Sequence, residues 1–135
     1  MKYWLCITNE ANWNVIRSKE VWGVSDRHKD KIAMTKEGDK FVFYVKPMRI
    51  GGIFEVISKP FREKNPIFEG EIYPHRVKIK PIVISKRFLE FRPLIGKLHF
   101  ITPKKKWGGH LQGKAMKPIP EEDFELMKKK LEQLL

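Results

Sequence analysis

Two short runs of strand-forming residues constrain the fold of this chain more than any other feature of its sequence. Residues 41–45 and 53–57 are rich in Phe, Val and Ile, which favour extended, half-buried backbone. Residues 47–52 connect them and contain Pro47 and a Gly-Gly pair, which predicts a β-hairpin with the two glycines as its hinge. At least one antiparallel strand pair is therefore expected in the fold.

Strand-like and helix-like segments alternate along the rest of the sequence, without an internal repeat or a low-complexity linker. The 135 residues suffice for one hydrophobic core, so residues 1–135 are predicted to form a single domain. Pro81 lies within a strand-like run and predicts a break or bulge, because proline cannot donate to a strand ladder. The expected elements are a strand at 3–8, a loop or short helix at 9–19, a helix at 25–36 followed by a turn at 37–39, a strand at 77–84, a short helix at 87–94 and a strand at 97–101.

Residues 120–135 predict an amphipathic helix. Pro120 suits its first turn, and the acidic residues 121–123 lie at the positive end of the helix dipole, whereas the lysines at 128–130 lie toward the other end. The apolar residues recur at helical spacing and are expected to pack on the core. They are Phe124, Met127, Leu131 and Leu134.

Asparagine and tryptophan gather directly after the first expected strand. Asn9, Asn12 and Asn14 lie within six residues, with Trp13 among them and Trp22 shortly afterwards. An asparagine amide presents a donor and an acceptor side by side, which suits a nucleobase edge, and an indole presents a flat face for stacking. The structural alternative is a capped loop above two core tryptophans, because Asn is a common cap residue and Trp is usually buried.

Basic residues outnumber acidic residues by 28 to 16, which gives a formal net charge of +12 and a pI near 9.9. The excess lies in the middle of the chain: residues 60–118 carry 14 basic and 4 acidic side chains, whereas residues 119–135 carry 3 and 5. A regional excess of this kind favours a nucleic-acid-binding surface over a merely solvated lysine-rich one. A membrane is not an expected partner, because no long basic amphipathic helix is present in the sequence.

Two loops are predicted to carry function. Residues 59–74 combine several prolines with aromatic residues, and loops of that length in a compact domain are usually functional or mobile. Residues 103–110 read Pro-Lys-Lys-Lys-Trp-Gly-Gly-His, in which lysines attract phosphate, glycines allow close approach and the indole can stack. The alternative for this second loop is an exposed hairpin tip whose Trp107 folds back onto the core.

Motifs for catalysis, metals and cofactors are scarce. The four histidines are scattered, and together with one cysteine they offer no metal-ligand spacing. The sequence contains no Walker loop, nucleophile elbow or dinucleotide fingerprint. Cys6 lies in an apolar strand pattern, where burial disfavours a reactive thiolate, and it is interpreted as a small buried hydrophobe. We therefore expect no catalytic residue, no metal and no cofactor.

The sequence also carries expectations about location and source. No apolar run approaches the roughly 18 residues of a membrane span, and residues 1–8 lack the features of a signal peptide, so a cytoplasmic location is expected. Lys and Glu are abundant whereas Gln occurs only at positions 112 and 133, which suggests a heat-adapted source. The sequence does not indicate an oligomeric state.

A series of short motifs runs nearly from end to end. They are Tyr3-Trp4-Leu5, Val21-Trp22-Gly23-Val24, Glu37-Gly38-Asp39-Lys40-Phe41-Val42-Phe43-Tyr44, Gly51-Gly52-Ile53-Phe54-Glu55-Val56, Tyr73-Pro74-His75-Arg76-Val77, Lys106-Trp107-Gly108-Gly109 and Glu121-Glu122-Asp123-Phe124. In order and spacing they resemble the EVE-domain family, small PUA-like proteins related to the YTH readers of N6-methyladenine in RNA. The chain looks like a stand-alone prokaryotic or archaeal member.

The resemblance implies an α+β fold. Its expected form is a PUA-like, strongly curved mixed β-barrel flanked by short helices, with the C-terminal helix packed on the barrel and a pocket at one edge. In this family the pocket is thought to accept a modified or flipped base, and in the YTH relatives an aromatic cage holds the methylated amine.

The resemblance also assigns roles to individual residues. Trp22 falls where the relatives place a cage tryptophan, Phe68 is the candidate for the second wall, and Trp13 is favoured as a core residue. The full base-pocket set is Asn9, Asn12, Trp22, Gly23, Phe68 and Trp107. The expected phosphate-binding set is Arg76, Lys104, Lys105, Lys106, Gly109, His110 and Lys114.

A non-catalytic nucleic-acid reader is therefore the predicted function, with RNA and DNA both open as the polymer. The basic surface would supply salt-dependent affinity, and the pocket would supply selectivity through stacking and edge hydrogen bonds. Two alternatives stay open. One is a PUA-like hydrolase acting on a modified nucleoside with Thr8, a lysine or a histidine, and the other is an adaptor that binds a small molecule or a protein.

Overall fold

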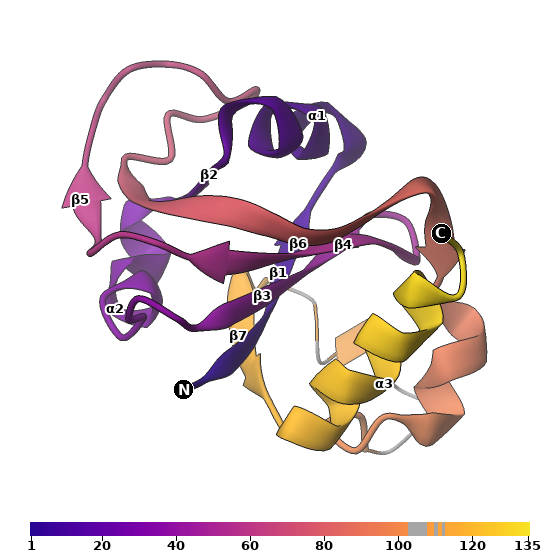
Figure 1. Cartoon of the computed structure of the whole chain (residues 1–135). Coiled ribbons are helices and arrows are strands. Elements are labelled where there is room, and N and C mark those ends of the chain that lie inside the picture. Colours follow the sequence, from indigo (N-terminus) through magenta and orange to yellow (C-terminus); the bar gives the residue numbers. More distant parts are fainter. Residues whose placement is uncertain (103–107, 110, 112) are drawn as a thin grey trace.

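A mixed, curved β-sheet forms the centre of the molecule, as Figure 1 shows. The computed structural model describes residues 1–102, 108, 109, 111 and 113–135. The strand order is β2-β6-β4-β3-β1-β7, and β5 pairs with β6 beside this path. β1 and β3 are parallel, and the other paired strands are antiparallel. The strands are β1 (Tyr3–Thr8), β2 (Val21–Val24), β3 (Lys40–Val45), β4 (Arg49–Val56), β5 (Phe61–Arg62), β6 (His75–Glu90) and β7 (Met116–Ile119).

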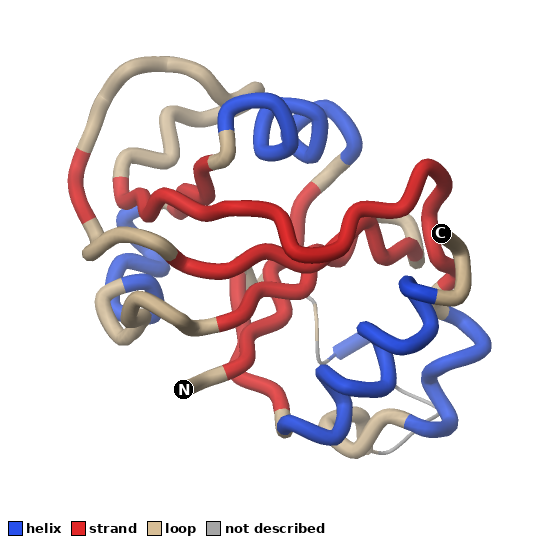
Figure 2. The backbone as a smooth tube through the Cα atoms, viewed as in Figure 1, coloured by secondary structure: helices blue, strands red, loops and turns tan. Residues whose placement is uncertain are grey.

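Short helices flank the curled sheet (Figure 2). They are α1 (Glu10–Lys19), the 3₁₀ helix η1 (Asp26–His28), α2 (Lys29–Ile32), the 3₁₀ helix η2 (Arg92–Lys97) and α3 (Glu121–Glu132). The expected α+β fold with a strongly curved mixed sheet, flanking helices and a packed C-terminal helix is confirmed. The sheet forms a half-barrel.

Two hydrophobic clusters lie on the two faces of the sheet, because successive strand side chains point to opposite faces. In β1, Leu5 and Ile7 belong to the cluster that α3 covers, and Trp4 and Cys6 belong to the cluster beside α1. Cys6 is free and fully buried, and this burial raises the pKa of its thiol well above the usual value. The prediction of a small buried hydrophobe at this position is confirmed.

The Gly-Gly pair packs inside β4 and does not form the predicted hinge. The chain turns at residues 46–48, before β4 begins. A Cβ atom on Gly51 would lie 2.7 Å from the Trp13 indole, and one on Gly52 would lie 2.8 Å from the Val83 carbonyl oxygen. These glycines let the Trp13 ring approach the sheet closely, and Trp13 is a core residue with 3% exposure, as favoured.

Strand β6 is continuous over sixteen residues and contains two bulges. The first lies beside Pro81, where Ile53 pairs with Val83 and Phe54 pairs with Pro81, so the proline bulges the strand without ending it. The predicted helix at 87–94 is wrong at its start. Glu90 pairs with Arg49, and tertiary pairing therefore keeps this segment in the sheet.

The predicted strand at 97–101 is also wrong, because a side chain captures its backbone donors. The buried carboxylate of Asp123, in the first turn of α3, accepts the backbone N–H groups of His99 at 2.8 Å and Phe100 at 2.9 Å. These donors are thus satisfied without a strand partner. Strand β7 was not predicted, and the helix expected at 25–36 is shortened to η1 and α2.

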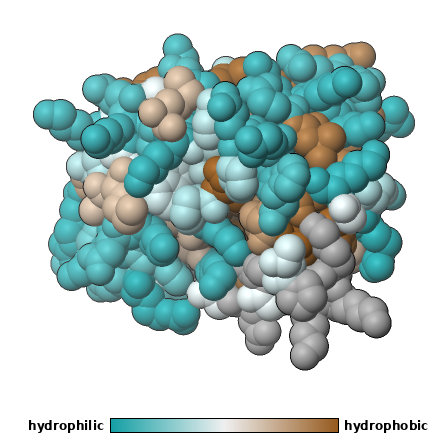
Figure 3. Space-filling model, turned by 90° about the horizontal axis from the view of Figure 1, so that it is seen from below, coloured by the Kyte–Doolittle hydropathy of each residue, from teal (hydrophilic) through white to brown (hydrophobic). Residues whose placement is uncertain are grey.

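The predicted helix at the C-terminus is confirmed as α3, with Pro120 at its N-cap and Phe124, Met127 and Leu131 buried. No helix in the described part of the chain is long and apolar enough to cross a membrane. Figure 3 shows one face of the molecule as mainly hydrophilic, with the largest hydrophobic area right of the centre and smaller apolar areas elsewhere.

Candidate functional site

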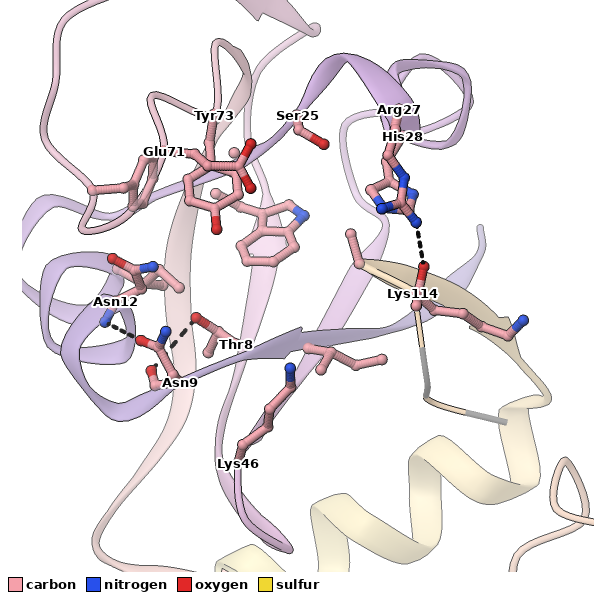
Figure 4. A pocket seen from close by; sticks show the side chains of 17 residues that line it. Thr8, Asn9, Asn12, Ser25, Arg27, His28, Lys46, Glu71, Tyr73 and Lys114 are labelled. Atoms are coloured by element: carbon pink, nitrogen blue, oxygen red, sulfur yellow. Dashed lines mark hydrogen bonds between the residues drawn. The ribbon is translucent and has the colours of Figure 1, made fainter. Parts of the chain in front are cut away.

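A pocket of about 360 Å³ opens where segments distant in sequence come together. Its walls come from the end of β1, from α1, β2 and η1, from the long loop before β6 and from the segment before β7 (Figure 4). The lining residues are Ile7, Thr8, Asn9, Asn12, Ile16, Trp22, Gly23, Ser25, Arg27, His28, Lys46, Phe68, Glu71, Tyr73, Gly113, Lys114 and Ala115.

The structure brings most of the sequence-predicted base-pocket residues to this one cavity. Asn9, Asn12, Trp22, Gly23 and Phe68 all line it. Lys114, which was predicted to contact phosphate, lines it as well. Trp107, Lys104, Lys105, Lys106 and His110 lie outside the described residues. Gly109 is described and exposed, but it does not line the pocket.

Trp22 combines a core position with a pocket position. Its side chain is 4% exposed, and its ring packs edge-to-face on Phe43 with centroids 5.4 Å apart. Strand β2 places it there because Trp22 pairs with Val77 at the antiparallel β6 edge. The indole Nε1–H is buried without an acceptor among the described residues. Trp22 is therefore a core residue that also lines the pocket.

Gly23 sets the distance between β2 and the long loop. A Cβ atom at this position would lie 2.7 Å from the carbonyl oxygen of Tyr73 and 2.9 Å from the ring of Phe68. Glycine thus lets Phe68 and Tyr73 approach the sheet closely. Phe68 and Tyr73 pack edge-to-face with centroids 5.6 Å apart, so the loop brings two aromatic rings to the pocket.

The two predicted base-reading asparagines are engaged within the protein. The Asn9 side-chain oxygen accepts the backbone N–H of Asn12 at 2.9 Å and caps α1. The Asn12 amide donates to the carbonyl oxygen of Glu69 at 3.1 Å and accepts its backbone N–H at 2.7 Å. Asn12 thus pairs with a peptide edge in the way that it was predicted to pair with a base edge, and it fastens the long loop to α1.

Arg76 holds the same loop from the other side. The predicted role of Arg76 as a phosphate contact does not fit its surroundings, because its side chain is fully buried. Its guanidinium donates to the carbonyl oxygens of Tyr73, Asn65 and Ile72 and forms an ion pair with Glu63. A group with so many internal acceptors has little left for a ligand. Arg76 is therefore a structural anchor of the loop.

Sequence reasoning missed several pocket residues, and their spacing in the chain explains why. Ser25, Arg27 and His28 lie in a segment that was predicted to be a helix without a functional role, and Lys46 lies in a turn. Tyr73 had one signal, its place among the aromatic residues of a long loop. Figure 4 shows Tyr73 and Lys46 pointing into the pocket from opposite sides. Only the fold brings these groups together.

The polar rim of the pocket is mainly basic. Arg27, His28, Lys46 and Lys114 contribute to it, and Glu71 is the acidic residue among the lining groups. Arg27 also donates to the carbonyl oxygen of Gly113 at 3.3 Å, which ties η1 to the segment before β7.

Burial and neighbouring charges shift two pKa values at this rim. Burial lowers the pKa of His28 below its ordinary 6.5, and Arg27 lowers it further, while Glu71 acts in the opposite direction. Burial raises the pKa of Tyr73 above 10.0, and Glu71 raises it further. At neutral pH the His28 imidazole is therefore neutral and the Tyr73 hydroxyl is a neutral hydrogen-bonding group.

The pocket shows no pairing typical of nucleophilic catalysis among its described side chains. The Thr8 hydroxyl donates to the carbonyl oxygen of Asn9 at 3.5 Å and has no general base as partner. The described residues also contain no group of three or more His, Cys, Asp or Glu side chains that could hold a metal ion.

Solved structures with the same fold include a YTH domain. The YTH domain of the MRB1 protein from Zygosaccharomyces rouxii, solved with N6-methyladenosine RNA, matches with a TM-score of 0.67 and 15% identity, covering 95% of this chain and 84% of that chain. The protein Atu2648 from Agrobacterium tumefaciens matches with a TM-score of 0.66 and 19% identity, covering 96% and 93%. At these identities the similarity shows the fold.

Sequence comparison identifies the family. The chain is 53% identical over 141 residues to a UPF0310 protein from Pyrococcus abyssi, covering 94% of this chain and 97% of that protein. It is 45% identical over 146 residues to a UPF0310 protein from Pyrococcus horikoshii, covering 97% and 99%. The family model described as EVE domain matches residues 2–130. The chain therefore belongs to the EVE domain family.

Proposed function

We propose that this protein is a nucleic-acid-binding module that takes one flipped or unpaired, modified base into the pocket beside Trp22, and that it binds without catalysis. One observation carries the proposal: a cavity of about 360 Å³ combines aromatic rings from β2 and the long loop with a rim of basic side chains. Aromatic faces accept the flat base, and the basic rim attracts the phosphates beside it.

The size and polarity of the cavity support a small planar ligand. Ligand pockets are typically about 300 to 1,000 Å³ in volume and combine apolar walls with a few placed polar groups. Here Trp22, Phe68 and Tyr73 supply the aromatic surface, and Ser25 and Lys46 supply polar groups. A base in this position would stack on one ring and hydrogen-bond through its edge.

The structural neighbours support the same ligand class. The Zygosaccharomyces rouxii neighbour was solved with N6-methyladenosine RNA, and another YTH neighbour, Pho92, was solved with m6A. The Asn12 amide already hydrogen-bonds to the Glu69 backbone, so a base-reading role for Asn12 is not part of this proposal. We therefore infer that selectivity in this pocket relies on the aromatic rings and the free polar groups more than on Asn12.

A binding titration against modified oligonucleotides tests the proposal. Single-stranded RNA and DNA carrying N6-methyladenine, a methylated cytosine or the unmodified base at one position are compared. Trp22→Ala should remove about 1 to 3 kcal/mol of affinity, the scale of one base–aromatic stack. It should leave the salt dependence of binding unchanged, because the phosphate contacts remain.

Thermal unfolding separates the effect of Trp22→Ala on stability from its effect on binding. Leu131→Ala is the control, because Leu131 is also buried but belongs to the hydrophobic cluster that α3 packs into, away from the pocket. Both variants should melt earlier than the parent, and Trp22→Ala should also bind modified oligonucleotides more weakly. If folded Trp22→Ala bound every oligonucleotide as the parent does, the pocket would not be the reading site.

A hydrolase acting on a modified nucleoside is the second candidate. Its support is the presence of Thr8, His28 and Lys46 on the same cavity. Incubation with free methylated nucleosides and chromatography of the products distinguishes the two functions. The reader proposal expects binding with no product, and turnover that Thr8→Ala or His28→Gln abolishes would replace it.

A further inference from the structure

The second bulge of β6 pushes two basic side chains out of the sheet. In the β4–β6 ladder, Ile50 pairs with Leu89 and Gly52 pairs with Ile84, so one residue of β4 faces residues 85–88 of β6. The buried Ser85 hydroxyl accepts the backbone N–H of Arg87 at 3.3 Å within the bulge. Bulges re-aim side chains and are often found beside functional sites.

The bulge faces α1 across a hollow of about 150 Å³. Arg17 enters this hollow from α1, and Lys86 and Arg87 enter it from the bulge, all three with exposed side chains. The Arg17 guanidinium donates to the Asn14 side-chain oxygen at 2.9 Å, which orients it on the helix surface. Three basic side chains, Arg17, Lys86 and Arg87, thus line the same small hollow.

The acidic residue of this hollow is already neutralised. Glu10 forms an ion pair with Arg49 at 2.9 Å, and the Arg49 guanidinium lies over the Phe88 ring at 4.4 Å. Arg49 therefore compensates Glu10 and leaves the charges of Arg17 and the bulge unbalanced.

A second hollow continues the basic surface. It lies between the end of β6, η2 and α3, has a volume of about 470 Å³, and shares Arg87 and Phe88 with the first. Lys97 and Lys130 line it, and Glu90 is its acidic residue. The described residues that line the two hollows thus include five basic side chains, Arg17, Lys86, Arg87, Lys97 and Lys130, which we call the basic groove.

A short path of contacts joins the basic groove to the pocket. Lys46 lines the pocket, its carbonyl oxygen accepts a hydrogen bond from Arg49, and Arg49 holds Glu10 at the edge of the groove. α1 separates the two sites and contributes to both, with Asn12 in the pocket and Arg17 in the groove.

We propose that the basic groove binds the sugar-phosphate backbone of the strand whose base enters the pocket. This inference rests on the proposed function, because the strand that the groove would hold is the one whose base enters the pocket. A pocket that takes one base needs further contacts to hold its neighbours, and paired cations on a fixed bulge supply contacts independent of base sequence. The basic groove lies beside a different face of α1 from the one that lines the pocket.

Charge removal at the bulge tests the proposal. Lys86→Gln combined with Arg87→Gln is measured against a short single-stranded oligonucleotide and against the same modified base as a nucleoside monophosphate. The oligonucleotide should bind more weakly, with a salt slope smaller by about 0.7 per lost contact, and the monophosphate should bind as before.

The matched control removes the same charge elsewhere. Lys59→Gln combined with Lys64→Gln neutralises two exposed lysines of the long loop that line neither hollow. Thermal unfolding should show both double variants folded, and the control should keep the parental salt slope. If both double variants lost the same affinity for the oligonucleotide, the effect would come from net charge alone, and the groove proposal would be overturned.

The remaining outcomes separate the groove from the pocket. An unchanged salt slope in Lys86→Gln/Arg87→Gln, with the preference for a modified base intact, would overturn the groove and leave the proposed function standing. A parent protein without any modified-base preference would refute the pocket instead. Competition by polyglutamate as effective as that by the oligonucleotide would mean that the groove serves an acidic protein, and would overturn the inference.

Discussion

Gly23 has no room for a side chain, since a Cβ atom would come within 3 Å of both Tyr73 and Phe68. Gly23→Ala should therefore push the long loop away from β2 and widen the aromatic part of the pocket. We expect weaker binding of the modified base and a loss of stability on the scale of overpacking, about 1 to 3 kcal/mol.

Gly96→Ala is the matched control, because a Cβ atom at this glycine has no neighbour within 4 Å. Titration and thermal unfolding of both variants check the prediction. A Gly23→Ala protein that binds and melts as Gly96→Ala does would show that the loop adapts without cost.

His28 should give binding a dependence on pH. Its folded-state pKa lies below the ordinary 6.5, so it is neutral at pH 7 and becomes cationic as the pH falls through the region below 6.5. A cation at the pocket rim attracts phosphate, so nucleic-acid affinity should rise over this range and binding should take up a proton. Titrations at several pH values with parent and His28→Gln measure the difference, which should vanish above the ordinary pKa.

Stability should change with the opposite sign. The unfolded state binds the proton first, so the contribution of neutral His28 is present above pH 6.5 and is lost as the pH falls toward the folded pKa. Thermal unfolding of parent and His28→Gln over the same range isolates this contribution from that of the carboxylates. If the difference in stability between parent and His28→Gln did not change with pH, His28 would not be the group that titrates at the rim.

At the scale of elements, α3 is fixed by burial on one face and by a carboxylate at its start. Phe124, Met127 and Leu131 are buried in the cluster beneath it, and Asp123 binds the backbone of residues 99–100. Leu131→Ala should destabilise the protein by about 2 to 5 kcal/mol, as large-to-small core changes do. Binding by the molecules that remain folded should be intact.

Leu134 supplies the comparison for this prediction. It follows Leu131 on the expected apolar face but lies beyond the end of α3 and is only half-buried. Leu134→Ala should therefore cost clearly less in chemical denaturation. Equal and small effects of the two substitutions would mean that the helix is peripheral to the fold.

The whole molecule shows which features followed from local sequence. Residues 3–8 and the strands around Phe41 and Phe54 form as predicted, because near-continuous runs of strand-forming apolar residues favour strands that are buried on both faces. α3 forms because its apolar residues recur at helical spacing and cover one face. The motif order also identified the family, and the aromatic and asparagine residues singled out from the sequence and the resemblance include four that line the pocket, Asn9, Asn12, Trp22 and Phe68.

Tertiary structure decided the partners of those residues and the shape of the site. Asn12 carries an amide suited to a base edge, but the fold places the Glu69 peptide against it, and Arg76 is buried by the loop that it holds. Residues 97–101 lose their strand character because Asp123, distant in sequence, takes their donors. Sequence by itself determined which segments had to be buried, since apolar runs predict strands inside the sheet and helical spacing of apolar residues predicts the buried face of α3. The pocket, its rim and the basic groove depend on contacts between distant segments, which only the folded chain brings together.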